Sequence, residues 1–240
     1  MSLAGQRIVV IGGTSGIGFA VAEAALSEGS AVAVASSNPQ NVEAATARLP
    51  GAEGFVLDVT DEGAVERAFA GLGRFDHLAF TAGDWGGPRR GLLMDLDLDA
   101  GRAIFNVRFW GAAAVAKHAA KAIAPAGSIT LTDGMIAHRP AKGSSLSTAM
   151  AGAVEHLTRG LAAELAPIRV NCVCPGMIRT GVWDSIPADV REARITQMTA
   201  RQPLARIGEP KEAAEAYLYL MRGGYTTGQV LRVDGGGSLV

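Results

Sequence analysis

A glycine-rich turn near the start of the chain could bind a phosphate group. Gly12, Gly16 and Gly18 stand in the run GGTSGIG, directly after the apolar run RIVVI. Glycines let a phosphate approach the backbone, and the amide groups at the start of a helix attract its negative charge. A tight turn without a ligand is the alternative for such a run taken by itself. The turn therefore indicates a dinucleotide site only in combination with other motifs.

Three further residues could orient a substrate or transfer a proton. Asp133 closes the run SITLTD, Ser147 lies near the start of the predicted helix SLSTAMAGAVEHLTRG, and Arg108 lies in FNVRFWG. A serine hydroxyl has a pKa too high for a general base near neutral pH, so Ser147 would orient a carbonyl group or a water molecule. Asp133 could handle a proton, and Arg108 could bind a carboxylate. The alternatives are a helix-capping Ser147, an Arg108 paired with a neighbouring acid, and an Asp133 that faces away from the pocket.

A histidine and a lysine follow Asp133 in the sequence. His138 and Lys142 have the i, i+4 spacing of one helix face, but Pro140 stands between them. Proline breaks a regular helix, so we expect both residues in a solvated loop above the sheet. They are the next candidates for a proton donor after Asp133 and Ser147.

A parallel sheet must position these residues, because short β-branched runs alternate with longer amphipathic segments along the chain. The runs VVIG and AVAVA are apolar at nearly every position, which is typical of strands covered on both faces. The order predicts an α/β fold, with helices on both sides of the sheet. A long helix is expected from Asn106 to Ile123, and the next from Ser145 to Gly160.

Composition limits the partners and the size of the fold. With 240 residues, 48% hydrophobic and 19% charged, the chain predicts one domain over 1–240, with a partly helical lid at about 177–208. A net charge of -1 without a basic stripe excludes nucleic acid and lipid as expected partners. We find no signal peptide and no apolar run of about 20 residues, so a cytoplasmic protein is expected. Cys172 and Cys174 are expected to be buried, and no metal site is predicted.

Five motifs in order resemble the short-chain dehydrogenase/reductase family, from about Gly5 to Gly236. IGGTSGIG stands where that family has T-G-x-x-x-G-I-G, LDV contains its adenine-binding D-V, and TAG ends its N-N-A-G. ELAPIRVNCVCPGMIRT matches the segment that ends in P-G-x-x-x-T, and GQVLRVDGG matches the closing strand. The resemblance implies a single doubly wound Rossmann domain with a seven-stranded parallel sheet, and NAD or NADP at the carboxyl ends of its strands.

The resemblance also implies a set of cofactor-binding residues. Those expected at the phosphates are Gly12, Thr14, Ser15, Gly16, Ile17 and Gly18. Asp58 and Val59 would meet the adenine, and Ala82 and Gly83 would lie along the ribose. Those expected towards the nicotinamide are Pro175, Gly176, Ile178 and Thr180.

The residues after the second strand bear on the choice between the two dinucleotides. A carboxylate there would bond the ribose 2′-hydroxyl and repel a 2′-phosphate. Ser36, Ser37 and Asn38 are neutral instead, which permits NADP, although the arginine that often binds the phosphate is missing. The sequence therefore favours NADP, with NAD as the alternative.

The family's proton-transfer residues are missing. In the family, a tyrosine four residues before a lysine acts as acid or base, and a serine orients the carbonyl group. Ser147 stands at the tyrosine position, Ala151 at the lysine position and Gly134 at the serine position. The family asparagine maps to Asn106 or Arg108, and the spacing does not choose between them.

Two functions follow from this combination. The first is an NAD(P)(H)-dependent oxidoreductase that acts on a small carbonyl or alcohol substrate with a non-standard proton donor. The second is a nucleotide-binding protein without redox turnover, such as a sensor, a partner subunit or a non-redox enzyme. Family members commonly pair the two long helices, so a homodimer or homotetramer is expected, with Trp110 as a candidate anchor.

Overall fold

The computed structural model describes residues 2–83 and 91–240. One seven-stranded sheet has the order β3-β2-β1-β4-β5-β6-β7, and every pair of neighbouring strands is parallel. The strands are β1 (Arg7–Ile11), β2 (Ala31–Ser36), β3 (Glu53–Val56), β4 (Phe75–Phe80), β5 (Ile123–Thr132), β6 (Arg169–Pro175) and β7 (Val230–Val233). The predicted doubly wound α/β fold with seven parallel strands is confirmed.

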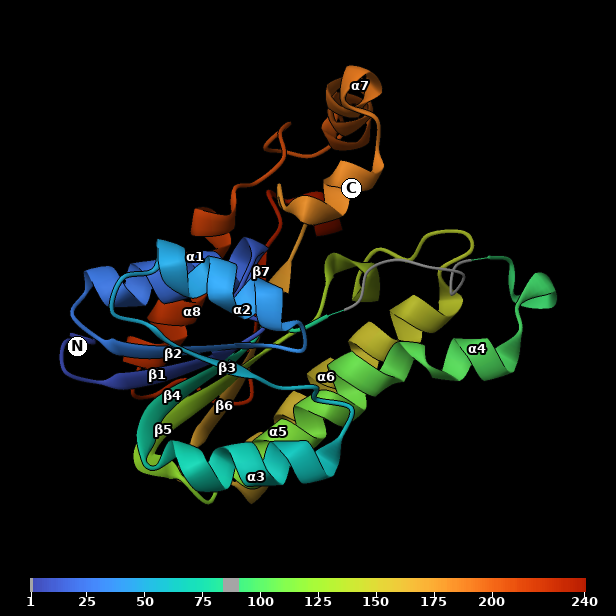
Figure 1. Cartoon of the computed structure of the whole chain (residues 1–240). Helices are drawn as coiled ribbons and strands as arrows, with labels where there is room; N and C mark the ends of the chain where they lie inside the picture. The colour runs from blue at the N-terminus through green and yellow to red at the C-terminus, as the bar shows by residue number, and fades with distance from the viewer. Residues whose placement is uncertain (1, 84–90) are drawn as a thin grey trace.

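Helices cover both faces of this sheet (Figure 1). They are α1 (Gly16–Ser27), α2 (Pro39–Arg48), α3 (Glu62–Leu72), α4 (Leu98–Arg102), α5 (Ala112–Ala119), α6 (Ser145–Glu164), α7 (Ala188–Thr199) and α8 (Pro210–Arg222). Figure 1 shows α3, α5 and α6 on one face of the sheet and α1 with α8 on the other. Within residues 2–83 and 91–240, every helix is too short or too polar to cross a bilayer.

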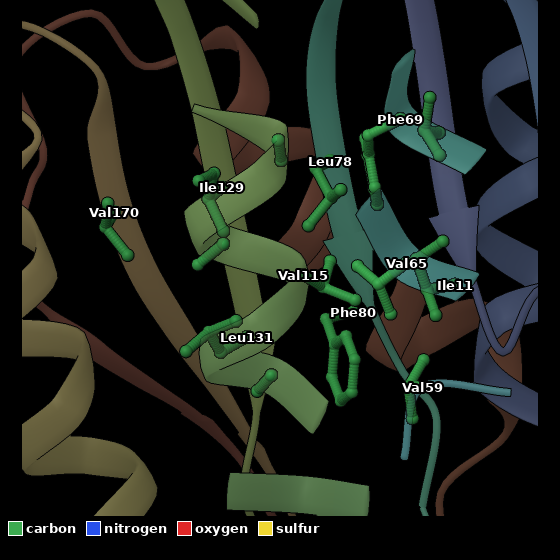
Figure 2. Packing of buried hydrophobic residues seen from close by; sticks show 14 of the residues in the cluster. Ile11, Val59, Val65, Phe69, Leu78, Phe80, Val115, Ile129, Leu131 and Val170 are labelled. Atoms are coloured by element: carbon green, nitrogen blue, oxygen red, sulfur yellow. The ribbon is translucent and has the colours of Figure 1, made fainter. Parts of the chain in front are cut away.

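The two faces of the sheet bury separate apolar clusters. In β1, Val9 and Ile11 point to the side of α3 and α5, whereas Ile8 and Val10 point to the side of α1 and α8. Successive side chains of a strand alternate between faces, so a strand covered on both sides is apolar throughout. Figure 2 shows the first cluster, in which side chains such as Phe80 pack between β4 and the covering helices. This packing explains the continuous apolar runs of the sequence.

The predicted helix from Asn106 to Ile123 is wrong at both ends. Its first part, Asn106–Gly111, is the π-helix η2, and its last regular helical residue is Ala119 at the end of α5. Ile123 begins β5 instead, where it pairs with Phe75 of β4. Ile123 is buried in the core, and its burial against the sheet outweighs the helical pattern of the preceding alanines. The π-helix carries Arg108, one of the predicted site residues.

The two ends of the segment predicted to form a lid lie side by side. Ile178 forms a parallel bridge with Gly208, and the Gly208 amide donates to the Met177 carbonyl at 2.9 Å. Between these ends lie the one-turn helix η4 (Gly181–Ser185) and α7, which stands apart from the two helix layers in Figure 1. The segment is therefore an excursion closed at its base, and its function as a lid stays a prediction.

Candidate active site

Three motifs that are far apart in the sequence meet at the carboxyl edge of the sheet. Gly12, just after β1, has a φ of 85°, and a side chain there would lie 2.5 Å from the Ala82 amide nitrogen. A side chain at Gly18 would lie 2.3 Å from the Gly12 carbonyl oxygen, and one at Gly16 would lie 3.1 Å from the Thr180 methyl group. These positions therefore require glycine, because other parts of the chain approach the backbone closely there. The motifs after β1, β4 and β6 form one surface.

This surface fits a pyrophosphate group. The glycine turn leads into α1, and Ser15 precedes its first residue in extended conformation without capping the helix by its side chain. The first amide groups of α1 thus lack that internal acceptor and can bind an anion. Thr14, Ile17 and the exposed Ser15 line the turn. These residues could hold the phosphates of a dinucleotide.

The predicted adenine contacts lie just beyond the end of β3. Asp58 is exposed, and one of its carboxylate oxygens accepts hydrogen bonds from the Thr60 amide at 2.9 Å and the Thr60 hydroxyl at 2.7 Å. Val59 is buried, and a side chain at Gly111 of η2 would lie 2.7 Å from it. Local bonds therefore orient Asp58, and core packing orients Val59. The contact of both residues with adenine stays a prediction.

The residues after β2 are neutral and mostly exposed. Ser36 ends the strand, Ser37 is exposed, and the side-chain oxygen of Asn38 accepts a 2.8 Å bond from the Gln40 amide to cap α2. Asn38 thus has a structural function in addition to any contact with a ribose. No carboxylate stands among these three positions.

The nicotinamide end of the predicted site is built from the turn after β6. Pro175 ends this strand, and the Gly176 amide donates to the Val233 carbonyl of β7 at 2.9 Å. A side chain at Gly176 would lie 2.6 Å from the backbone of Asp234. Ile178 is buried where it bridges to Gly208. The turn is therefore held against β7 and the base of the predicted lid.

A hollow lies beside this turn. It has a volume of about 760 Å³ and runs between α1, η4 and the start of α8. Gly16, Phe19, Thr180, Trp183 and Pro210 are among its lining residues. The predicted lid thus borders open space next to the glycine turn.

Asp133 and Arg108 come together at the centre of the same edge. Asp133 follows the last residue of β5 and is fully buried, and Arg108 of η2 is 2% exposed. The Arg108 guanidinium donates a 2.9 Å hydrogen bond to the backbone carbonyl of Asp133 and lies where a side chain at Gly83 would be. Arg108 therefore fixes the end of β5 and leaves the Asp133 carboxyl group to other partners.

The Asp133 carboxyl group faces a second acid. One side-chain ligand atom from each of Asp133, His138, Glu155 and Cys174 lies within 4.8 Å of the others. Burial, and then the proximity of Glu155, raise the pKa of Asp133 to about 7. Asp133 is thus poised to exchange a proton near neutral pH, as a general acid must.

Glu155 joins Asp133 to His138. Glu155 lies on the buried face of α6, and its carboxyl oxygen lies 2.6 Å from Nε2 of His138. His138 lies in a turn, and its side chain is 24% exposed, so it is half-buried rather than open to solvent. The short helix η3 (Met135–Ala137) turns His138 back towards α6. Lys142, by contrast, is exposed as expected.

The residues at the positions of the family's tyrosine, lysine and serine differ from one another in burial. Ser147 is half-buried in the first turn of α6, Ala151 is 1% exposed one turn further on, and Gly134 is buried after Asp133. Among the described residues, no hydrogen bond links Ser147 to Asp133 or Arg108. The structure therefore brings Asp133 and Arg108 together through a hydrogen bond.

Three further side chains near this edge are buried in their protonated forms. The Tyr217 hydroxyl lies 2.6 Å from the Thr132 hydroxyl, and burial raises the pKa of Tyr217 above its usual range. Cys172 and Cys174 are both buried and free, as expected, and burial raises the pKa of each thiol. A tyrosine or cysteine in this state does not lose its proton near neutral pH. Neither is a candidate acid for the reaction.

Glu155 was missed by the sequence analysis, although one signal could have revealed it. The buried face of α6 carries Met150, Ala151, Val154, Glu155 and Thr158. A glutamate is almost never fully buried unless it is paired. An acid on the apolar face of a predicted helix is therefore a reason to look for a buried partner.

Comparisons with known proteins agree with this geometry. The family model described as enoyl-(acyl carrier protein) reductase matches residues 11–238. The short-chain dehydrogenase/reductase ATR9 of Stachybotrys chlorohalonatus is 36% identical, over 99% of each chain. The solved MalC reductase/Diels-Alderase of Malbranchea aurantiaca is 34% identical with a TM-score of 0.92, over 99% of this chain and 98% of that chain.

A second solved relative bears on the cofactor. A small-chain dehydrogenase in complex with NADPH is 34% identical with a TM-score of 0.85, over 98% of this chain and all of the other. The named relatives are dehydrogenases and reductases, so the chain is an oxidoreductase of the same type with a site for a nicotinamide cofactor. With the ordered motifs, the seven-stranded sheet and these matches along nearly its whole length, the chain belongs to the short-chain dehydrogenase/reductase family.

Proposed function

We propose that the protein is an NADPH-dependent reductase of small carbonyl compounds, in which Asp133 supplies the proton. The observation that carries this proposal is the buried carboxyl group of Asp133 at the edge where the cofactor motifs meet. Its pKa of about 7 allows it to hold a proton at neutral pH and to release it to an alkoxide. The reverse reaction, oxidation of an alcohol, would use the same carboxylate as a base.

The cofactor would supply the hydride, and the chain's own residues would position and protonate the substrate. Arg108 would hold the end of β5 so that Asp133 keeps its place. Ser147, half-buried at the start of α6, would orient the substrate carbonyl group. Ser147 is expected to contribute less to the rate than Asp133, because its hydroxyl group would orient the carbonyl group without transferring its proton.

NADPH is the preferred dinucleotide in this proposal. Ser36, Ser37 and Asn38 offer neutral groups where a carboxylate would repel a 2′-phosphate. The relative that was solved with NADPH supports the same choice. Calorimetric titration with NADPH and NADH tests it, and a clear preference for NADH would reverse the assignment.

Oxidation of bound NADPH tests the reductase proposal. We expect the wild type to oxidise NADPH with at least one member of a panel of ketones, quinones and imines, followed by absorbance in single-turnover experiments. Asp133→Asn should slow the reaction about 10²- to 10⁴-fold, the usual contribution of one general acid. Ser147→Ala should slow it less. Full activity in Asp133→Asn would reject Asp133 as the proton donor.

A nucleotide-binding protein without redox turnover is the second candidate. It is favoured by one observation, that Ser147 and Ala151 replace the tyrosine and lysine that transfer protons in the family. Saturable NADPH binding without oxidation by any member of the panel would favour this second function.

We also propose a homodimer or homotetramer built on η2, α5 and α6. Trp110 of η2 is 63% exposed, although a side chain of this size is usually at least partly covered. Its ring packs edge to face on Phe109, with 4.9 Å between centroids. An exposed tryptophan that packs on a half-buried phenylalanine beside alanine-rich helices is suited to a second copy of the chain.

A further inference from the structure

Glu155 has a titratable neighbour on two sides. Its side chain is 7% exposed, and its Oε1 atom lies 2.6 Å from Nε2 of His138. On the other side, its carboxyl group shares the 4.8 Å cluster with the carboxyl group of Asp133. Three groups that can carry protons therefore stand in one row, from the end of β5 through α6 to η3.

The row leads from the buried edge of the sheet to solvent. Asp133 is fully buried, whereas the His138 side chain is 24% exposed. Two carboxylates that face each other in a buried place repel, so such a pair tends to keep one proton between them. Asp133 and Glu155 therefore hold an exchangeable proton, and His138 connects it to water.

We propose that Glu155 and His138 relay protons from solvent to Asp133, in place of the tyrosine and lysine that are missing here. The proposal rests on the reductase function proposed above, in which Asp133 protonates the product. Glu155 and His138 act through Asp133 and are positioning residues rather than catalytic ones. The row explains why a buried acid and a half-buried histidine lie together at positions outside the family's catalytic motif.

The proton balance of one turnover is complete. A bound reduced nicotinamide would supply the hydride to the substrate carbonyl carbon, and the Asp133 carboxyl group would give its proton to the alkoxide. A proton then passes from Nε2 of the His138 imidazolium to Glu155, and from Glu155 to the Asp133 carboxylate. The imidazole ring takes a proton from solvent. The carbonyl compound, one hydride and one solvent proton thus become the alcohol.

Other charged or titratable groups face the row from η2, from α6 and α8, and from β6. They are Arg108, Arg159, Tyr217, Cys172 and Cys174. Arg159 lies 3.7 Å from the second oxygen of Glu155. The cysteines and the tyrosine stay protonated because burial raises the pKa of each. The proposed relay therefore runs through Asp133, Glu155 and His138 and excludes the cysteines and the tyrosine.

A bound metal ion is the competing explanation for this cluster. Two ligands about 2.1 Å from a tetrahedral ion lie about 3.4 Å apart. The ion-pair contact of 2.6 Å between Nε2 of His138 and Oε1 of Glu155 is shorter than this separation. The geometry therefore favours a shared proton over a metal ion.

The first test measures protonation in the protein without cofactor. Infrared spectra across a pH titration report the band of a protonated carboxyl group, and its loss in Asp133→Asn assigns the band. We expect Glu155→Gln to lower the pH at which the band disappears by about one unit or more, because the facing negative charge is removed. A titration unchanged from the wild type, or one equivalent of bound metal in the purified protein, would overturn the relay.

The second test measures turnover. We expect Glu155→Gln and His138→Ala to slow single-turnover NADPH oxidation about 10- to 100-fold, most strongly at high pH, where protons are scarce. Added imidazole should restore the rate of His138→Ala but not that of Glu155→Gln. His156→Gln is the matched control, since His156 is the next residue of α6 but is exposed.

The outcomes separate the relay from the reductase proposal. An active wild type whose rate and pH profile survive in both relay variants rejects the relay alone. A wild type that oxidises NADPH with no member of the panel rejects the reductase function and the relay with it. If Glu155→Gln does not fold, imidazole rescue of His138→Ala decides, because rescue supports the relay and its failure rejects it.

Discussion

The Arg108 guanidinium lies against Gly83 and donates a 2.9 Å hydrogen bond to the backbone carbonyl of Asp133. This relationship joins the turn after β4, the π-helix η2 and the end of β5 at one point. A buried guanidinium needs several acceptors, and the short backbone of a glycine leaves room for it. The position of the proposed proton donor therefore depends on the absence of a side chain at residue 83.

Gly83→Ala should disturb this arrangement. A methyl group at residue 83 would lie 2.2 Å from Nη2 of Arg108, which is buried and cannot move aside freely. We expect NADPH oxidation to fall at least about tenfold and the free energy of unfolding to fall by about 1–3 kcal/mol. Gly71→Ala in α3 is the control, because nothing lies within 4 Å of the added methyl group. Equal urea denaturation curves and rates for the two variants would contradict the prediction.

Asp133→Asn should stabilise the protein at alkaline pH. Burial and Glu155 raise the pKa of Asp133 from 3.8 to about 7, so the folded state binds more protons than the unfolded state between these values. The contribution of Asp133 to the free energy of unfolding is therefore fully present below pH 4 and is lost as the pH rises towards 7 and above. At pH 8 we expect the free energy of unfolding of the asparagine variant to be about 2–4 kcal/mol higher than that of the wild type. Near pH 4 the two values should be equal.

Urea denaturation at the two pH values measures this difference. Glu215→Gln serves as the control because Glu215 is an exposed acid of α8. A variant that is less stable than the wild type at pH 8 would show that the Asp133 carboxyl group is stabilised by its surroundings rather than strained by them.

His77 should make the fold sensitive to acid. Its ring bonds Ser128 at 2.8 Å and Gln6 at 2.7 Å, and burial, with Arg169 nearby, lowers the pKa of His77 from 6.5 to about 4. The unfolded state therefore takes up a proton first, and stability falls as the pH drops from about 6.5 to 4. This contribution is about 3 kcal/mol at most.

Replacing the histidine removes this acid sensitivity. The stability advantage of the wild type over His77→Gln should shrink between pH 7 and pH 4.5 in urea denaturation. His156→Gln, in which an exposed histidine is changed, should follow the wild type at every pH. A constant difference between His77→Gln and the wild type would show that His77 is not buried in its neutral form.

Trp110→Arg should break the proposed oligomer. Trp110 is exposed on η2, and a charge at the centre of an apolar interface is strongly unfavourable. We expect light scattering to give a multiple of 24.7 kDa for the wild type at micromolar concentration and about 24.7 kDa for the variant. Tyr219→Arg is the control, since Tyr219 is an exposed aromatic residue of α8. A monomeric wild type would refute the interface.

The sequence alone predicted the fold and the cofactor half of the site. Gly12, Gly16 and Gly18 signal a turn after β1 because close approach of backbone segments excludes side chains there. The apolar runs predict covered parallel strands, and parallel strands bring their carboxyl ends to one edge. These features depend on local backbone geometry and burial, and both directly restrict which residue types can occupy a position.

The surroundings of the proposed proton-transfer residues were decided by the tertiary structure. Arg108, Asp133, His138 and Glu155 come from η2, the end of β5, η3 and α6, and no spacing in the sequence relates them. The residue type of Asp133 does not by itself distinguish it from an aspartate on the surface. Its pKa is raised because the sheet and α6 exclude water and place Glu155 opposite it, and only the folded chain creates that environment.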